Sequence, residues 1–197
     1  MTVPLIIFLL AVVLPIFFSK IRSAPIWLLI QALALVWNGV AHHGALSLHS
    51  FIALLELLLI RGVIAPFWLR RAIDQRAQPN LDLMPSNLFA WVIAITLIVL
   101  AFKFGAPSLS DSQALTLGVV GATVTVALLL LSSNNSPPAQ LVAVLFMENA
   151  LALFESIFPE PWPLPVHGAL SAIYLLTIFV GSWLIASRDP AAVEEHA

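Results

Sequence analysis

Seven long stretches of apolar residues, separated by short polar connections, dominate the sequence. A membrane-spanning helix needs about 20 mainly apolar residues, within a range of about 17–25. Stretches of this kind cover residues 3–19, 25–41, 51–69, 87–104, 113–131, 139–158 and 166–186. They are apolar throughout and do not alternate, which excludes the strand pattern of a membrane barrel. We therefore predict an all-α, polytopic membrane bundle of about seven transmembrane helices.

The connections between these stretches are short and rich in turn-forming residues. They include Gly105-Ala106-Pro107 and a segment, 132–138, that carries an Asn-Asn and a Pro-Pro pair. The longest connection, 70–86, is the only clearly hydrophilic one. No connection is long enough for a domain outside the membrane. Residues 1–186 are therefore expected to form one transmembrane domain, followed by a short tail over residues 187–197.

Composition supports a membrane protein and excludes several other classes. Hydrophobic residues make up 61% of the 197 residues and charged residues only 9%, whereas a soluble domain carries about 25% charged residues. The net charge of −2 gives no basic surface for nucleic acid. The chain has no cysteine, so it forms no disulfide, iron–sulfur cluster or reactive thiolate of its own.

The positive charges predict an orientation in the membrane. Lys20 and Arg22 follow the first apolar stretch, an order that suits a retained helix rather than a signal peptide. Because lysine and arginine favour cytoplasmic loops, we expect the N-terminus outside and the C-terminal tail in the cytoplasm. Six lysines and arginines then lie on the cytoplasmic side and only Lys103 on the other. The location implied is a bacterial or archaeal plasma membrane, the inner membrane where a cell has two.

The chain also resembles itself when it is shifted by 118 residues. Gln31-Ala32-Leu33-Ala34-Leu35 then falls on Asn149-Ala150-Leu151-Ala152-Leu153, and His49 falls on His167. Stretches one to three overlay stretches five to seven in the same direction, with the fourth as a linking helix. This is a candidate parallel repeat of three plus three helices. Alanine–leucine runs are common in membrane helices, so chance similarity is the alternative.

Three ionisable residues, Glu56, Arg61 and Glu148, lie well inside the apolar stretches. An ionisable group at the bilayer centre costs at least about 2.5–3.5 kcal/mol on insertion scales, so it normally faces the bundle and has a partner. Arg61 and Glu148 share a predicted depth near mid-membrane, and we expect them to lie close together or to bridge through water. Glu56 and Arg61 are five positions apart and do not share a face of an α-helix well.

Further polar residues extend this pair towards the outer surface. Glu155 lies seven positions after Glu148 and hence on the same helical face. Asn149 adjoins Glu148, and His49 and His167 are predicted at outer helix ends. Together these residues could form a proton or ion relay. The alternative is that Arg61 and Glu148 are only a structural tie and that the others are interfacial residues.

Pro66 predicts a kink in the third helix. It cannot donate a hydrogen bond to the carbonyl of Gly62, so the helix should bend just after Arg61. Freed carbonyls beside a buried cation mark ion sites in some transporters, although a kink that serves only packing is equally compatible with the sequence. His42 and His43 lie in a wet loop and are given no role.

Several catalytic and cofactor chemistries find no support in the sequence. Glycine-rich phosphate loops, a His-Glu-x-x-His zinc pattern and a nucleophile elbow are all absent. The seventh stretch has no lysine for a retinal Schiff base. We expect no cofactor, no metal site and no catalytic residue on this chain.

The segment Leu145-Phe146-Met147-Glu148-Asn149-Ala150-Leu151-Ala152-Leu153 resembles the Met-Glu-Asn segment of the hydrogenase-4 membrane component E family. The segments Gln31-Ala32-Leu33-Ala34-Leu35-Val36 and Arg61-Gly62-Val63-Ile64-Ala65-Pro66 agree with that family in order and spacing. In the family, the cationic position before the proline is often lysine, so arginine here keeps the charge but deprotonates less easily. The resemblance covers roughly residues 25–73 and 144–185.

Members of that family are small membrane subunits of group 4 nickel–iron hydrogenases and formate hydrogenlyase-like complexes, and they are similar to subunit K of complex I. The resemblance implies a place for Glu148 in the line of charged residues along the membrane arm of such complexes. It implies no family role for Glu56 or Glu155. It also implies partners: antiporter-like and other membrane subunits, and hydrogenase-like peripheral subunits.

The expected function is therefore a non-catalytic membrane subunit of a complex I-like or group 4 hydrogenase-like oxidoreductase. It would help to couple redox chemistry on its partners to the translocation of protons or sodium ions. One alternative is a free-standing small transporter or channel with Arg61 and Glu148 at its substrate site. Another is a purely structural membrane scaffold.

Overall fold

The structure, a computed structural model, describes residues 2–18, 20–42, 48–74, 82–83, 88–104, 111–158 and 162–187. Its elements are α1 (Thr2–Phe18), a short 3-10 turn η1 (Ile21–Ser23), α2 (Ala24–His42), α3 (Leu48–Glu56), the π-helix η2 (Leu57–Ile64), α4 (Ala65–Asp74), α5 (Leu88–Lys103), α6 (Asp111–Ser133), α7 (Pro137–Glu155) and α8 (Leu164–Ser187). Because α3, η2 and α4 follow one another without a break, the described residues form seven helical rods. This confirms the all-α bundle predicted from the sequence.

Five of the seven rods are long and apolar enough to cross a membrane. They are α2, the α3–η2–α4 rod, α6, α7 and α8. Helices α1 and α5 are equally apolar but shorter, at 17 and 16 residues. Many large apolar side chains, such as Phe89 and Trp183, face outwards, which is the expected surface of a protein whose solvent is lipid. The length and composition of these helices are those of a multi-pass membrane protein.

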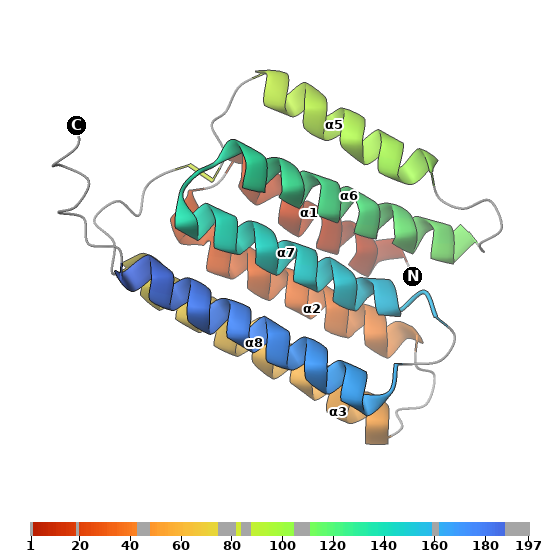
Figure 1. The fold of residues 1–197 in the computed structure, drawn as a ribbon. Helices are drawn as coiled ribbons and strands as arrows, with labels where there is room; N and C mark the ends of the chain where they lie inside the picture. The colour runs from red at the N-terminus through yellow and green to blue at the C-terminus, as the bar shows by residue number, and fades with distance from the viewer. Residues whose placement is uncertain are drawn as a thin grey trace, which may run out of the picture.

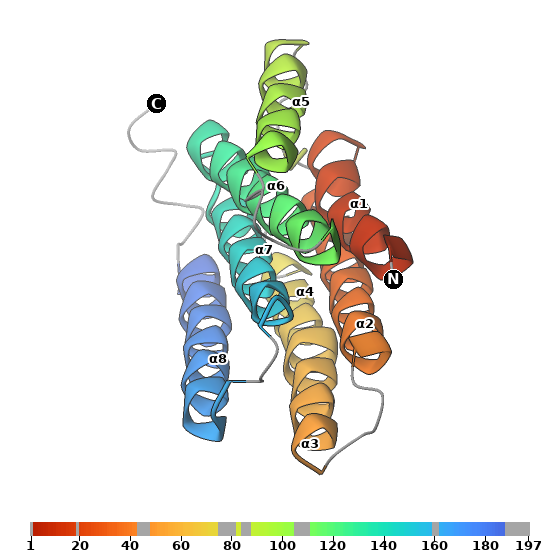
Figure 2. The ribbon, with the colours of Figure 1, turned by 90° about the vertical axis from the view of Figure 1, so that its right-hand side faces the viewer.

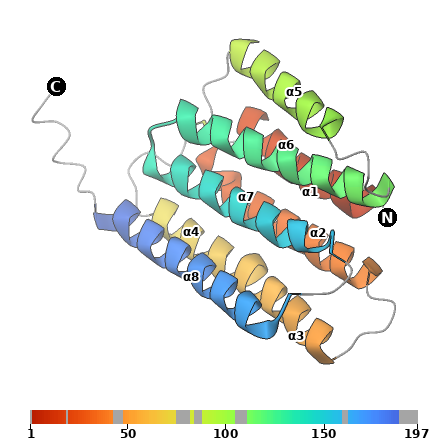
Figure 3. The ribbon, with the colours of Figure 1, turned by 45° about the vertical axis from the view of Figure 1, so that its right-hand side comes forward.

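The seven rods lie side by side in successive layers (Figure 1). Figure 2 shows α5 at one end of the stack, followed by α6 with α1, then α7 with α2, and finally α8 with α4. Seen from the intermediate direction of Figure 3, helices α6, α7 and α8 lie in front of α1, α2 and α4. The direct packing contacts follow the same order: α1 packs on α6, α2 on α7, and α4 on α8.

This packing matches the candidate repeat. The first three rods pair one to one with the last three, and α5 links the two halves while packing mainly against α6. The members of each pair run in the same direction (Figure 1), as a parallel repeat requires. This arrangement is compatible with the 118-residue shift, with α5 in the place of the linking helix, and the repeat itself stays a prediction.

Glycine allows two of the helix pairs to approach closely. A Cβ atom on Gly118 of α6 would lie 2.4 Å from a ring carbon of Phe102 on α5. One on Gly181 of α8 would lie 2.5 Å from a methyl carbon of Leu141 on α7. Small residues serve this purpose in membrane bundles, where helix association depends on close van der Waals packing. The contact at Gly181 brings α8 against α7, which positions the polar side chains described next.

Candidate functional site: a line of ionisable residues along α8

Helix α8 presents four polar side chains on one face. His167, Ser171, Tyr174 and Thr177 are spaced by four, three and three residues, which places them in a row along the helix. Each of them contacts a different ionisable residue of α3, η2 or α7. We call these four residues the α8 polar face. They join the ionisable residues singled out in the sequence into one line.

At one end of the line, Glu148 of α7 meets Thr177. The Thr177 hydroxyl donates a hydrogen bond to Glu148 Oε1 at 2.8 Å. Helix α7 also positions the neighbouring Asn149, which is fully buried and points to a different side of the helix. The two side chains diverge because consecutive residues of an α-helix are turned by about 100° from one another. Glu148 thus faces α8, and Asn149 faces the interior of the bundle.

Arg61 lies at the centre of the line and is almost fully buried, with 4% of its surface exposed. Its Nη1 donates to Asn149 Oδ1 at 2.8 Å, and its guanidinium carbon lies 4.2 Å from the centre of the Tyr174 ring. The Asn149 amide in turn donates from Nδ2 to Gln31 Oε1 at 2.7 Å. A buried cation over an aromatic face is a favourable arrangement, so Arg61 is held by neutral groups from α7 and α8.

Arg61 and Glu148 were expected to lie close together or to bridge through water, and the described residues show no direct ion pair of 4.0 Å or less between them. Arg61 binds the adjacent Asn149 instead, because the turn of α7 directs Glu148 to α8. The two charges still interact electrostatically at longer range. That the two residues lie close together or bridge through water stays a prediction.

At the other end of the line, two carboxylates meet the start of α8. The Ser171 hydroxyl donates to the carboxylate of Glu56. His167 Nε2 lies 2.8 Å from Glu155 Oε1, with 16% of each side chain exposed. The backbone N–H of Trp162 also donates to Glu155 Oε1, at 2.9 Å. Glu155 and His167 are therefore brought together as the predicted track requires, and Glu56 joins them through α8.

The π-helix explains why Glu56 and Arg61 both reach α8. On an ordinary α-helix these two residues, five positions apart, would point in different directions, and that was the expectation from the sequence. In a π-helix the hydrogen bonds run from residue i to i+5, so positions five apart lie nearly one above the other. The segment Leu57–Ile64 has this geometry, and the backbone N–H of Ala65 bonds to the carbonyl of Ile60. The expectation was wrong because it assumed α-helical turns.

The remaining candidates from the sequence have less to do with this line. Pro66 is the second residue of α4, directly after the π-helix, and the kink assigned to it stays a prediction. The side chain of His49 and those of His42 and His43 lie outside the described residues. Within the part of the chain that is described, no three histidine or acidic side chains gather as a metal site would require.

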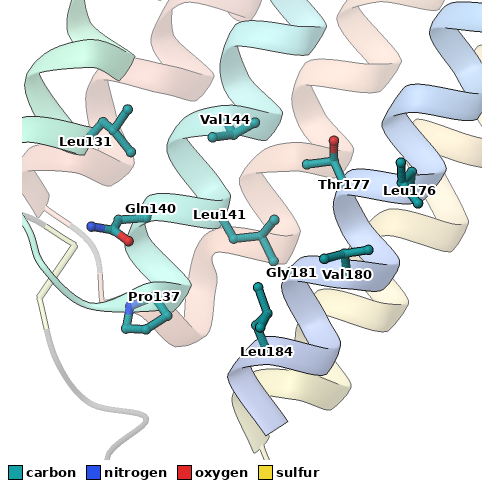
Figure 4. Close-up of a pocket in the computed structure, with 10 residues that line it drawn as sticks. All are labelled: Leu131, Pro137, Gln140, Leu141, Val144, Leu176, Thr177, Val180, Gly181 and Leu184. Atoms are coloured by element: carbon teal, nitrogen blue, oxygen red, sulfur yellow. The ribbon is translucent and has the colours of Figure 1, made fainter. Parts of the chain in front are cut away.

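A groove between α7 and α8 is lined in part by Thr177, the hydrogen-bond partner of Glu148. It has a volume of about 510 Å³ and is lined mainly by apolar side chains, with Gln140 and Thr177 as its polar members. Figure 4 shows Thr177 at one end of the groove and Leu184 and Pro137 towards the other. Because the Thr177 hydroxyl is the group that holds Glu148, the groove ends one hydrogen bond away from that carboxylate.

Four members of the site were not singled out from the sequence as site residues: Gln31, Ser171, Tyr174 and Thr177. A signal for three of them was present, because polar residues at 167, 171, 174 and 177 mark one face of an otherwise apolar helix. For Gln31 the signal was its alignment with Asn149 in the repeat.

Comparison of the chain with protein-family models, with curated proteins and with solved structures finds no match.

Proposed function

We propose that this chain is a non-catalytic membrane subunit that helps to move protons or sodium ions past a line of buried ionisable residues. The observation that carries the proposal is the α8 polar face. It gives each of Glu148, Arg61, Glu56 and Glu155 one polar partner along a single helix. Ionisable residues inside transmembrane segments are rare, and they typically mark ion pathways and proton relays.

The way Arg61 is held favours a pathway over a structural tie. A tie would pair Arg61 directly with Glu148, so that both charges were neutralised. Instead Arg61 binds the neutral amide of Asn149 and the face of Tyr174, and Glu148 binds only a hydroxyl. Glu148 is therefore not locked to a permanent counter-charge and can change its protonation state or its ion.

The proposed setting is a complex I-like or group 4 hydrogenase-like oxidoreductase in a bacterial or archaeal plasma membrane. Its support is the resemblance of the Glu148 and Arg61 segments to the hydrogenase-4 membrane component E family. In this setting the redox chemistry belongs to partner subunits, with antiporter-like subunits as membrane neighbours. The lysine and arginine distribution supports an N-terminus outside and a C-terminus in the cytoplasm.

The proposal is tested by Glu148→Gln in the intact complex, purified in mild detergent and reconstituted into vesicles. Glutamine keeps the shape and the hydrogen bond to Thr177 but cannot carry a proton. We expect normal amounts of assembled complex and reduced ion movement per electron transferred. Asp111→Asn, which removes an exposed carboxylate at the start of α6, is the matched control and should change neither quantity.

Two results would contradict the proposal. Normal assembly with normal coupling would show that Glu148 has no part in ion movement. Lost assembly would show a structural role instead, because removing one member of a buried charged pair costs about 3–5 kcal/mol. The double variant Arg61→Met with Glu148→Gln separates these cases further, since it removes the stranded charge without restoring a proton site.

The groove between α7 and α8 favours one second candidate, a free-standing transporter or channel. A volume of about 510 Å³ would admit a small molecule, and its end at Thr177 would present that molecule to Glu148. Isolation in mild detergent distinguishes the two functions. Co-purification with hydrogenase-like or antiporter-like subunits supports the first, whereas a stable chain that transports a solute by itself supports the second.

A further inference from the structure

We infer that internal water molecules bind at the centre of the bundle, beside Gln31 of α2, Arg61 of η2 and Glu148 of α7. The inference goes beyond the proposed function and rests on the hydrogen-bonding capacity of these three side chains. Arg61 and Gln31 both form hydrogen bonds with Asn149, and Glu148 directly precedes Asn149 in α7. Each has one buried polar atom that no described residue satisfies: Gln31 Nε2, Arg61 Nε and Glu148 Oε2.

The direction of the central hydrogen bonds leaves Gln31 with a donor to satisfy. A guanidinium only donates, so the Asn149 atom facing Arg61 must be its oxygen. The Asn149 NH₂ group then faces Gln31, and the Gln31 atom that receives it must also be oxygen. Gln31 Nε2 is consequently turned away from Asn149. This orientation follows from the charge of Arg61 and not from a choice between similar-looking atoms.

The unsatisfied atoms require both an acceptor and a donor. Gln31 Nε2 and Arg61 Nε each need an acceptor, and Glu148 Oε2, when ionised, needs a donor. Gln31 is fully buried and Arg61 is 4% exposed, so bulk solvent does not serve them. Leaving such groups unmet costs about 1–3 kcal/mol each, and more for charged groups.

Water is the ligand that fits this mixed requirement. An anion would satisfy the two donors but would be repelled by the carboxylates of Glu148 and Glu56. A metal cation would satisfy Glu148 but would be repelled by Arg61, and by His167 when it is protonated. A water molecule both accepts and donates, and buried waters typically make about three hydrogen bonds to such otherwise unsatisfied groups. Water can therefore satisfy each of the three atoms, whether the atom needs an acceptor or a donor.

Hydration here would give the line of ionisable residues a continuous polar interior. Glu148 would connect through water to the Arg61–Asn149–Gln31 chain, and thus to groups on three helices. The binding of water does not depend on whether ions move through the protein, so it can be tested without any transport measurement.

The test is radiolytic hydroxyl labelling of the full-length protein in lipid nanodiscs, read residue by residue by mass spectrometry. Radicals formed from bound water label neighbouring side chains even where these are buried. Tyr174 is fully buried against Arg61, and Phe146 is fully buried among apolar side chains of the core. After normalisation to each residue's labelling in the unfolded chain, we expect Tyr174 to be labelled several-fold faster than Phe146.

Two variants sharpen the test. Gln31→Leu removes one of the two donors and should lower the labelling of Tyr174. The matched variant Gln140→Leu removes a glutamine that lines the α7–α8 groove and should leave Tyr174 unchanged. If Gln31→Leu does not fold, the comparison of Tyr174 with Phe146 in the unaltered protein still decides.

Equal normalised labelling of Tyr174 and Phe146 would overturn the inference. So would labelling of Tyr174 that changes when sulfate in the buffer is replaced by chloride while the labelling of Phe146 stays constant, since that result would place an anion at Arg61. Strong labelling of Tyr174 combined with normal coupling in Glu148→Gln would uphold the water site and reject the proposed function, so the two conclusions fail separately.

Discussion

Gln31 and Asn149 are hydrogen-bonded to each other across the bundle, and they occupy equivalent positions of the candidate repeat. The Asn149 amide donates to Gln31 Oε1 at 2.7 Å, and the residues are 118 positions apart. This interval is the same as the shift that aligns the two halves of the sequence. Neighbouring positions of α2 and α7 are also buried in register, in the pairs Ala24 and Val142, Leu28 and Phe146, Ala32 and Ala150, and Leu35 and Leu153. Equivalent faces of the two halves therefore meet at the centre of the molecule.

The Asn149 amide should be essential for stability, because it satisfies both Arg61 and Gln31. Asn149→Leu leaves a buried guanidinium without its acceptor, and we expect a loss of about 3 kcal/mol or more in the free energy of unfolding. The measurement is SDS-induced unfolding of the purified protein. Asn149→Asp keeps an acceptor for Arg61 and should be less destabilising. Equal losses in the two variants would show that Arg61 does not need this acceptor.

The Thr177 hydroxyl should matter for ion movement more than other threonine hydroxyls. Thr177→Val keeps the shape of the side chain but removes the hydrogen bond to Glu148, and we expect reduced coupling with a stability loss of about 1 kcal/mol. Thr125→Val is the control, because the Thr125 hydroxyl bonds only to backbone carbonyls of its own helix. An ion-flux assay that does not distinguish the two variants would remove Thr177 from the pathway.

Gly181 should be intolerant of larger side chains, because a Cβ atom there would lie 2.5 Å from Leu141. We expect Gly181→Leu to separate α8 from α7 and to destabilise the protein by about 1–3 kcal/mol, the usual cost of overpacking. On the same helix, a Cβ atom at Gly168 would meet nothing within 4 Å. Gly168→Leu should consequently be near neutral in the same unfolding assay. Similar losses at both glycines would argue against a close α7–α8 contact.

Glu155 and His167 should be energetically coupled. Their side chains are 2.8 Å apart and mostly shielded, so a double-mutant cycle with Glu155→Gln and His167→Gln should give an interaction energy of about 0.5–3 kcal/mol. The cycle is measured by unfolding at a pH where the unaltered pair is intact. Strictly additive losses would mean that the two residues contact each other without stabilising the fold.

The orientation in the membrane is open to direct labelling, because the chain has no cysteine of its own. Single cysteines introduced after Arg76 and after Arg188 should both be protected from a membrane-impermeant reagent added to intact cells. They should react once the membrane is opened. Labelling of either position from outside would reverse the predicted topology.

The helices were predictable because nearly every residue in them is apolar, and this pattern continues over the whole length of each helix. A run of about 20 apolar residues has few alternatives to a spanning helix, so all seven rods could be placed from the sequence. The proximity of Glu155 and His167 followed from the same reasoning, since both were expected near one end of adjacent helices.

The centre of the site was harder to predict because it depends on side-chain direction. From depth alone, Arg61 was expected to lie near Glu148. Whether Glu148 or Asn149 faces Arg61 depends on the rotation of about 100° between consecutive residues of α7. The contacts of Glu56 depend on a π-helix, and no local pattern in the sequence predicts a π-helix there. The roles of Ser171 and Tyr174 depend in turn on where the π-helix places Glu56 and Arg61.

The π-helix can also be regarded as one additional residue accommodated within the rod formed by α3, η2 and α4. Its wider turns place Glu56 and Arg61 nearly one above the other, although they are five positions apart. Deleting one residue between them would leave them four positions apart, the spacing that an ordinary α-helix already places on one face. The π-helix therefore accommodates one residue more than an α-helix would need to present both charges to α8.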